Sequence, residues 1–272
     1  MKKTILTMTV MTMFLFGGLS GASFADKSVP KQTAKKPAVK SKTAAATTVF
    51  DMGHTEIFSP VKEGPLNYST FHDIWKLSGE EVGLNKEAVT AARLSKVKTY
   101  IIAGPVQSFT REEVAALESF VKNGGNLLVL LHIAPPVAQL TNTFGILVSN
   151  FTIGETTGLI GNKSQDFFVT NFGPHPVSAG LEKLSVYGTW GLMANEPAVT
   201  VAATTAKAWA DMDRNRKFDK GEPQQEFGIV AVSEAGKGKV VVVADDAPFA
   251  NKFIGEADNR RLAENIIRWF KQ

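Results

Sequence analysis

The chain of 272 residues contains no cysteine and only four histidines. Without a thiol it forms no disulfide, carries no lipid on a cysteine and offers no thiolate nucleophile. The sequence also lacks a glycine-rich phosphate loop, a serine-centred nucleophile elbow and a His-x-x-x-His metal motif. The chain is therefore not a cysteine-dependent enzyme, and it lacks the usual sequence signatures of nucleotide-binding proteins and of serine hydrolases.

Long apolar runs are also scarce. A single one, residues 5–16, follows Lys2 and Lys3 and leads into small residues that end at Ala25. A basic start, an apolar core and small residues form the pattern of a secretory signal peptide, with cleavage after Ala25. The core is too short for a permanent membrane helix. We therefore predict a signal peptide over 1–25 and an extracytoplasmic mature chain, periplasmic or secreted, without a stable membrane span.

Residues 26–48 consist mainly of lysine, alanine, threonine, serine and proline, with almost no side chains to bury. This composition predicts a disordered linker. The first 48 residues carry eight lysines and one aspartate, which leaves 22 basic and 25 acidic residues in the rest of the chain. The net charge of +4 therefore comes from the N-terminal segment, and we predict no nucleic-acid-binding surface on the folded part.

Residues 211–222 form the most specific motif in the chain, with the sequence DMDRNRKFDKGE. Oxygen-bearing side chains stand at positions 1, 3, 5, 9 and 12 of these twelve residues, the spacing of a calcium loop. A calcium ion takes six to eight oxygens at about 2.3–2.6 Å, and this spacing lets one loop surround it. The predicted ligands are the side chains of Asp211, Asp213, Asn215, Asp219 and Glu222 and the backbone carbonyl of Lys217.

The surroundings of this loop favour strands on both sides. Pro223 disfavours a helix directly after the loop, and the segments VTVAATTAKAW before it and FGIVAV after it have strand character. Position six, where a calcium loop usually has glycine, is Arg216. A charged hairpin without a metal ion is the alternative interpretation, because basic residues within the loop reduce the repulsion among its carboxylates.

From residue 49 onward, apolar strands alternate with amphipathic helices. Strands are predicted at residues 47–52, 98–104, 126–132 and 237–246, and helices at 111–123 and 258–272. Thr110 and Glu113 have the spacing of a capping box at the start of the first helix. The pattern predicts one α/β domain over 49–272, with a doubly wound, mostly parallel sheet of the amidotransferase-like or flavodoxin-like kind. Residues 150–230 are richer in turns and predict an inserted β-region that carries the calcium loop.

Four segments, in this order, resemble a known family. They are FDMGH at 50–54, the strand–helix–strand segment at 101–131, GPHPVSAGL at 173–181, and the segment from 236 to 252 followed by DNRRLAENIIRW. Together they look like the family shared by a gliding-motility transporter component and an intraflagellar-transport protein (GIFT). That family is similar to the ThuA-like and class I glutamine-amidotransferase-like folds. The resemblance spans nearly all of 49–272.

The amidotransferase reaction does not carry over with this resemblance. In that fold the strand that matches residues 126–131 leads into a sharp turn presenting a cysteine nucleophile, and His132 stands at or beside that position here. Imidazole cannot perform thiolate chemistry, so glutamine amidotransferase activity is excluded. The resemblance implies a binding fold, and members of this wider group are proposed to bind carbohydrate.

Ligands of open α/β sheets bind beyond the carboxyl ends of the strands. If the polar residues at these ends converge, they form a ligand pocket suited to sugar hydroxyls, a second metal ion or acid–base chemistry. In the alternative, the carboxylates fix loops and the histidines are satisfied near the core. The six residues are Asp51, His54 and Glu56 after the first strand, His132 after the central strand, and Asp245 and Asp246 after the last.

Two functions fit these features. The first is a non-catalytic, calcium-binding accessory module for a glycan or a cell-envelope protein. The second is a hydrolase that uses the strand-end histidines and aspartates. A hydrolase needs these groups within hydrogen-bond reach of one another in a concave pocket, whereas a binding module does not. Trp190 offers a flat face for a sugar ring under the first hypothesis, although tryptophan more often packs into a core.

Overall fold

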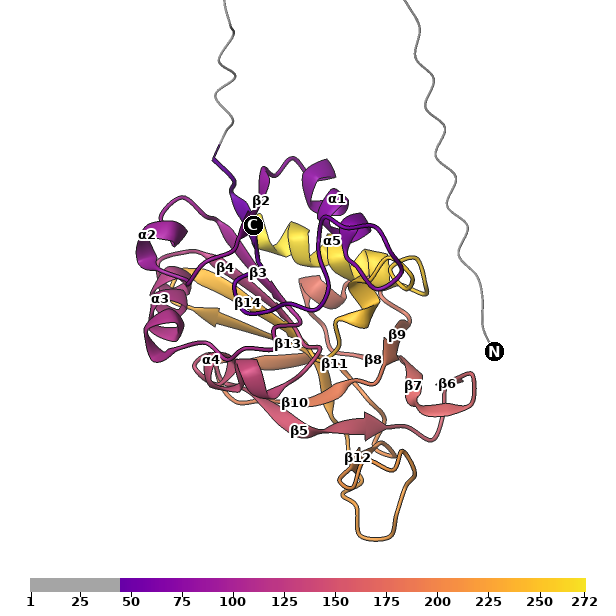
Figure 1. Cartoon of the computed structure of the whole chain (residues 1–272). Helices are drawn as coiled ribbons and strands as arrows, with labels where there is room; N and C mark the ends of the chain where they lie inside the picture. Colours follow the sequence, from indigo (N-terminus) through magenta and orange to yellow (C-terminus); the bar gives the residue numbers. More distant parts are fainter. Residues whose placement is uncertain (1–44) are drawn as a thin grey trace, which may run out of the picture. The chain divides into compact units, whose positions relative to one another are not determined.

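The computed structural model describes residues 45–272 (Figure 1). The predicted signal peptide, residues 1–25, and residues 26–44 of the predicted linker lie outside this part of the chain. Thr48, which we assigned to the linker, is the first residue of strand β1. Within residues 45–272, no helix has the length and apolar character needed to cross a membrane.

Eleven strands form one mixed sheet, and half of this sheet is parallel. The strand order in this half is β2–β1–β3–β4–β14, and every neighbouring pair is parallel. All residues of β3 and β4 are buried, as expected for parallel strands covered on both faces. The bounds are β1 Thr48–Asp51, β2 Val82–Asn85, β3 Thr99–Ala103, β4 Asn126–Leu130 and β14 Gly238–Val243.

The other half is antiparallel, so our prediction of a mostly parallel sheet was wrong. From β14 outward the order is β13–β10–β5–β12, and β11 pairs with both β13 and β8. No α-helix interrupts residues 146–238, and neighbouring strands joined without a crossover helix pair antiparallel. The bounds are β5 Ile146–Gly154, β8 Asn171–Phe172, β10 Trp190–Ala194, β11 Val199–Ala203, β12 Trp209–Asp211 and β13 Gly228–Ala235.

The inserted β-region also contains a small separate sheet. Its three antiparallel strands are ordered β6–β7–β9. They comprise β6 Leu159–Ile160, β7 Lys163–Val169 and β9 Leu184–Tyr187. This sheet and the antiparallel half of the large sheet account for the turn-rich composition of residues 150–230.

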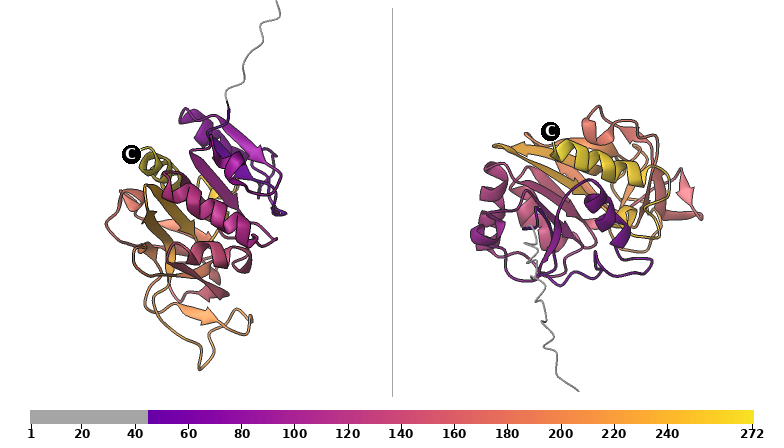
Figure 2. Two further views of the ribbon diagram at one scale, coloured as in Figure 1. Left: turned by 90° about the vertical axis from the view of Figure 1, so that its left-hand side faces the viewer. Right: turned by 90° about the horizontal axis from the view of Figure 1, so that it is seen from above.

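Helices cover both faces of the large sheet (Figure 2). The alternation of side chains along β4 explains why: Leu128 and Leu130 belong to one core, and Leu127 and Val129 to the other. The first core packs against α1 Ser69–Leu77, η3 Ala247–Phe249 and α5 Asn259–Phe270. The second packs against α2 Ala91–Leu94, α3 Arg111–Lys122, η1 Pro135–Val137 and α4 Ala138–Asn142. A further short helix, η2 Pro176–Ser178, follows β8.

The predicted capping box at the start of α3 is confirmed. The backbone N–H of Glu113 donates to Thr110 Oγ1 at 3.2 Å, and the Glu113 side chain accepts from the Thr110 N–H at 2.9 Å. Two N–H groups that would otherwise lack partners at the helix start are thereby satisfied.

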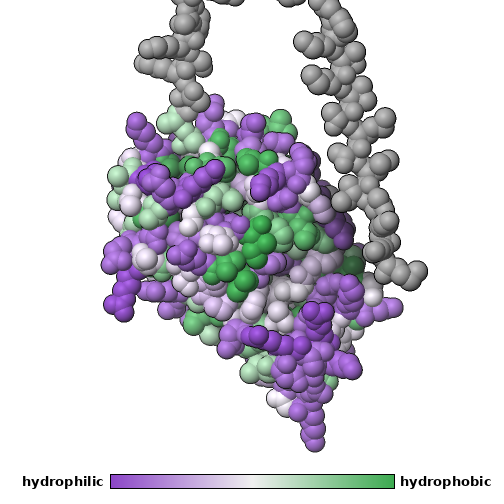
Figure 3. All heavy atoms as spheres, viewed as in Figure 1, coloured by the Kyte–Doolittle hydropathy of each residue, from purple (hydrophilic) through white to green (hydrophobic). Residues whose placement is uncertain are grey.

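The predicted calcium loop projects from the sheet between β12 and β13. It forms the lower end of the view in Figure 1, and hydrophilic residues cover this projection in Figure 3. A strand precedes the loop and β13 follows it without a helix between them, as Pro223 predicted. Strand β12 lies at one edge of the large sheet, whereas β1, β3, β4 and β14 lie in its parallel half.

Candidate functional site

The six predicted strand-end residues form two groups at the carboxyl edge of the parallel strands. The groups are separated along the sheet by β3, which lies between β1 and β4. The first group is Asp51, His54 and Glu56, after β1; the second is His132, Asp245 and Asp246, after β4 and β14. Four of the six are buried, Glu56 is partly buried, and the His132 side chain is 37% exposed.

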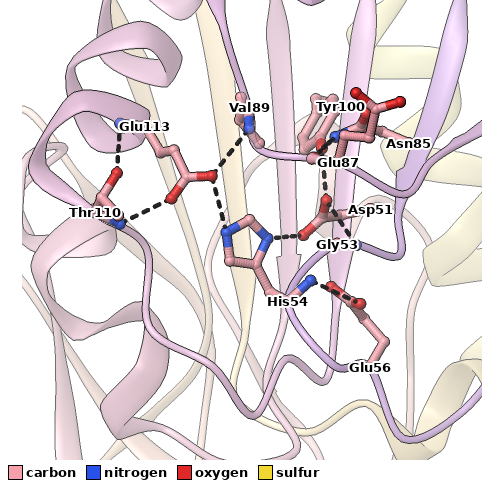
Figure 4. Close-up of polar contacts among 10 residues, drawn as sticks. All are labelled: Asp51, Gly53, His54, Glu56, Asn85, Glu87, Val89, Tyr100, Thr110 and Glu113. Carbon is pink, nitrogen blue, oxygen red and sulfur yellow. Dashed lines mark hydrogen bonds and ion pairs between the residues drawn. The ribbon is translucent and has the colours of Figure 1, made fainter.

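In the first group, His54 lies between two carboxylates (Figure 4). Its Nδ1 lies 2.6 Å from Asp51 Oδ2, and its Nε2 lies 3.2 Å from Glu113 Oε1. The residue is only 3% exposed, and its ring stacks on Phe109 with a centroid separation of 3.7 Å. Both ring nitrogens therefore face acceptors, and only the protonated imidazolium can donate to both.

The surrounding chain holds this group in place. Tyr100, on β3, donates its hydroxyl to Asp51 Oδ1 at 2.7 Å, and Asn85 Nδ2 donates to the Tyr100 hydroxyl at 2.9 Å. Val89 N–H donates to Glu113 Oε1 at 2.9 Å. The backbone of Gly53 packs against that of Glu87, because a Cβ at Gly53 would lie 2.9 Å from the carbonyl oxygen of Glu87. Hydrogen bonds from three separate segments thus hold the two carboxylates beside His54.

The electrostatics of the first group favour bound protons. Burial opposes the charge of His54, but the hydrogen bonds and charges of Asp51 and then Glu113 raise the pKa of His54 above its usual value. Burial, followed by the neighbouring Asp51 carboxyl, raises the pKa of Glu56 to about 8. Glu56 Oε1 is buried and has no hydrogen-bond partner. The group is therefore a buried hydrogen-bonded network in which the protonated forms of His54 and Glu56 are favoured, with one carboxyl oxygen left unpaired.

The second group is centred on Asp246. Tyr68 donates its hydroxyl to Asp246 Oδ2 at 2.5 Å, and His132 Nδ1 lies 3.3 Å from Asp246 Oδ1. This hydrogen bond to Asp246 is the main reason why the pKa of His132 is raised. The ring of Phe58 meets the imidazole edge-on at 5.2 Å. His132 is thus the one member of the six whose ring is substantially open to solvent.

Asp245 binds backbone N–H groups rather than His132. Its carboxylate accepts the N–H groups of Tyr187 at 2.5 Å and Ala247 at 2.9 Å. Burial, and then the charge of Asp246, raise the pKa of Asp245 to about 8. The β3 end at Gly104 makes room for the second group, because a Cβ there would lie 2.9 Å from Asp246 Oδ2 and 3.0 Å from His132 Cβ.

This geometry bears on the hydrolase hypothesis. An acid–base pair must reach a proton on a bound substrate, yet the side chains of Asp51, His54 and Asp246 are already paired with protein groups and almost fully buried. The arrangement matches the alternative in which carboxylates fix loops and His54 is satisfied near the core. His132 keeps an exposed imidazole with a carboxylate behind it.

The third site is the loop after β12. One carboxylate oxygen each from Asp211, Asp213 and Glu222 lie within 4.8 Å of one another. Glu222 accepts the N–H groups of Met212 at 2.8 Å and Asp219 at 2.9 Å, which closes the twelve residues into a ring. Positions 1, 3 and 12 of the motif are thus brought together.

The middle of the loop folds around the remaining predicted ligands. Asn215 N–H donates to Asp213 Oδ1 at 3.0 Å, Lys217 N–H donates to Asn215 Oδ1 at 2.7 Å, and Asn215 Nδ2 donates to Asp219. At position six, Arg216 has a φ of 65°, the left-handed conformation that glycine usually supplies there. Arg216 thus has the left-handed backbone that is usually left to glycine at this position.

Sequence reasoning missed three residues of these sites. Glu113 was recognised only as a helix cap, yet its second role is to face His54. Tyr68 and Tyr100 bind the buried Asp246 and Asp51 through their hydroxyls. A signal was present for Tyr100, because it lies in an apolar strand and a tyrosine buried there needs a partner for its hydroxyl.

We expect the stability of the domain to fall as pH rises from 6.5 to 8.5. A group whose pKa is raised on folding contributes stability that is complete below its unfolded pKa and lost as pH rises through the folded pKa. Four groups behave in this way: Glu56, Asp245, His54 and His132. The groups with lowered pKa values, Glu80, Glu113, His175 and Asp258, change stability only below about pH 6.5.

Urea denaturation at pH 6.5, 7.5 and 8.5 measures this effect. Each raised group contributes at most about 1.4 kcal/mol per pH unit. Asp245→Asn should flatten the slope, since it removes one such group while keeping an oxygen that accepts an N–H. Stability that rises with pH across this range would contradict the favoured protonation of the two groups.

The chain belongs to the family described as "Domain of unknown function (DUF4350)", which matches residues 62–267. No curated protein matches the chain. Among solved structures, the chain is similar to the mmIFT52 N-terminal domain, with a TM-score of 0.68 and 19% identity, covering 83% of this chain and 98% of that one.

The chain is also similar to two further solved structures. The cytoplasmic protein STM1381 from Salmonella typhimurium LT2 has a TM-score of 0.52 and 14% identity, over 83% of this chain and 99% of its own. A ThuA-like protein from Bacteroides uniformis ATCC 8492 has a TM-score of 0.49 and 15% identity, over 86% and 95%. The predicted resemblance to the class I glutamine-amidotransferase-like fold is confirmed, and the chain has no cysteine for amidotransferase chemistry.

Proposed function

We propose that this member of the DUF4350 family is a calcium-binding, non-catalytic module that acts outside the cytoplasm on a glycan or a cell-envelope partner. The observation that carries the proposal is the folded loop at residues 211–222. Its three carboxylates at positions 1, 3 and 12 lie together, and its sixth residue has a left-handed φ, which suits the sharp turn expected at this position of a calcium loop. The N-terminal signal-peptide pattern supports the location.

The chemistry of the loop fits calcium better than magnesium. Asp211, Asp213, Asn215, Asp219 and Glu222 all offer oxygen, the ligand atom of hard cations. Calcium accepts irregular geometry and six to eight ligands, whereas magnesium requires a near-ideal octahedron and retains its water. Asp211 would bind as the buried ligand, because it is only 1% exposed and Gln165 already orients its Oδ2 at 2.6 Å.

The strand-end groups support a module more than an enzyme. The hydrogen-bonded groups around His54 and Asp246 hold neighbouring loops together and present little exposed reactive surface. A binding module needs rigid loops at the carboxyl edge, and these networks supply them. The exposed side chain of His132 remains available for a contact with a partner.

Calcium should raise the melting temperature of the mature chain by a few degrees. Extracellular calcium modules have dissociation constants on the order of 0.1–1 mM. At ten times the dissociation constant, binding only to the folded state adds about 1.4 kcal/mol of stability. Chelator should remove the gain, and magnesium at the same concentration should give a smaller shift. Thermal unfolding in calcium, magnesium and chelator measures all three.

Variants separate the loop from general effects of the ion. Asp213→Asn and Glu222→Gln remove ligand charge at two of the three clustered positions and should abolish the calcium shift. Glu182→Gln is the matched control, because Glu182 is an exposed carboxylate outside the loop and should leave the shift intact. If millimolar calcium gives neither heat of binding in calorimetry nor a thermal shift, the calcium module is rejected.

A further inference from the structure

A cleft lies directly beside the predicted calcium loop. Its volume is about 420 Å³, and its lining includes Trp190, Phe151, Asn150, Gln165, Arg214 and Arg216. A neighbouring hollow of about 660 Å³ shares Gln165 and Arg216 with it. The two hollows therefore adjoin at one glutamine and one arginine, and together they leave room for more than one small residue of a polymer.

One part of the cleft lining is aromatic. Trp190 is half-buried and its Nε1 donates to the carbonyl oxygen of His132 at 3.1 Å, which fixes the orientation of the indole. Phe151, on β5, lines the same cleft and is partly buried. Rigid aromatic surfaces beside amide side chains suit a ligand that has both C–H faces and hydroxyl groups. A sugar ring has this combination.

The other part of the lining is cationic. Arg214 and Arg216 are both exposed. Within residues 45–272, the ion pairs formed by arginine involve Arg93, Arg260 and Arg261. Neither guanidinium group at the cleft forms an ion pair with a carboxylate, although Asp211 lines the same cleft. Guanidinium binds carboxylate, phosphate or sulfate through paired N–H donors, so this side of the cleft favours an anion.

Calcium would strengthen this preference. The twelve-residue loop contains four carboxylates and four basic side chains, so its net charge is zero without the ion. One bound calcium ion would leave the loop at +2, and its ligands would include Asp211, which also lines the cleft. The electrostatic potential at the cleft would then become more positive.

Arg214 and Arg216 share an unusual backbone conformation. Both have a φ of 65°, in the left-handed region that glycine adopts without steric strain. A glycine at either position would satisfy the turn at lower cost. Of the three positive-φ positions in the loop, one is Gly221, whereas the other two carry a long cationic side chain that lines the cleft.

We propose that this cleft binds an acidic sugar unit of a polysaccharide, and that calcium bound in the neighbouring loop strengthens the binding. Arg214 and Arg216 contact the acidic group, while Trp190 and Phe151 contact the sugar ring. The inference rests on the calcium-binding function proposed above and assigns it a class of ligand. It goes beyond that proposal by placing the ligand site beside β5, β10 and the loop rather than at the strand ends.

The experiment uses the mature chain and two hexasaccharides of equal length. One alternates glucuronic acid with N-acetylglucosamine, and the other contains N-acetylglucosamine alone. Tryptophan fluorescence and calorimetry measure binding with 2 mM calcium and with chelator. We expect the acidic hexasaccharide in calcium to bind at least tenfold more tightly than the neutral one, and at least fivefold more tightly than it binds in chelator.

Arg216→Gly is the decisive variant, because glycine fits a φ of 65° and position six of a calcium loop. It should retain the calcium-induced thermal shift and weaken acidic-sugar binding at least tenfold. Arg214→Gln should also weaken binding. Lys220→Gln is the control, since it removes one positive charge of the same loop away from the cleft lining, and it should change binding less than twofold.

The experiment distinguishes a failure of the calcium proposal from a failure of the cleft proposal. If wild-type protein shows the calcium shift but binds both sugars equally or not at all, the cleft proposal is overturned and the calcium module stands. If calcium has no effect on stability or on sugar binding, the calcium module fails and the calcium-dependent cleft fails with it. If Arg216→Gly and Lys220→Gln weaken binding of the acidic hexasaccharide equally, the attraction is unspecific and the proposed ligand class is overturned. Tighter binding of polyglutamate than of the acidic hexasaccharide would overturn it in the same way.

Discussion

Replacement of His54 by alanine is expected to lower the free energy of unfolding by about 3–5 kcal/mol, because it leaves two buried carboxylates without their shared cation. Asp51 and Glu113 face the two ring nitrogens at 2.6 and 3.2 Å. The variant also removes the stacking of the imidazole on Phe109. Urea denaturation at pH 6.5 of wild type and variant measures the difference.

The pH dependence of this loss identifies its cause. Because the pKa of His54 is raised on folding, its ionic stabilisation is complete below about pH 6.5 and is lost as pH rises through the folded pKa. The gap between wild type and His54→Ala should therefore narrow at pH 9. His132→Ala is the matched control: its side chain is 37% exposed, so we expect a loss of about 1 kcal/mol or less. Similar losses in the two variants would mean that His54 is not the centre of a buried ion network.

The parts of the fold that could be predicted from the sequence depend on local patterns. The capping box at Thr110 and Glu113 lies within one turn of helix, and the apolar runs of β3, β4 and β14 indicate burial on both faces. The direction of pairing in the other half could not be inferred in this way. It depends on which strand lies beside β5 or β13 in space, and no residue of those strands specifies a partner.

In the candidate sites, too, local sequence patterns could be predicted and long-range contacts could not. The spacing of Asp211, Asp213 and Glu222 is local, and the structure brings these three residues together. The predicted strand-end residues lie at one edge of the sheet, but most of them are buried by contacts with distant segments, which the sequence does not reveal. Glu113 illustrates the difficulty: its role as a cap is visible in four residues of sequence, whereas its contact with His54 joins segments 59 positions apart.

Trp209 anchors the base of the calcium loop, and its replacement by alanine is expected to reduce the free energy of unfolding by about 3–5 kcal/mol. The side chain is 1% exposed, and its ring lies 6.0 Å from that of Phe218 in the loop. Gly154 on β5 allows this packing, because a Cβ there would lie 2.2 Å from the Trp209 ring. Gly154→Ala alone should therefore displace the indole and destabilise the fold by about 1–3 kcal/mol.

The double variant tests whether these two effects share one cause. In Gly154→Ala/Trp209→Ala the new methyl group has no ring to displace and fills part of the cavity that the indole leaves. The combined loss in urea denaturation should then be smaller than the sum of the single losses by at least about 0.5 kcal/mol. If the sum of the two single losses equals the loss of the double variant to within about 0.3 kcal/mol, Gly154 does not make room for Trp209. Trp209 and Asp211 both belong to β12, which pairs with β5, so this packing lies directly beside the first predicted calcium ligand.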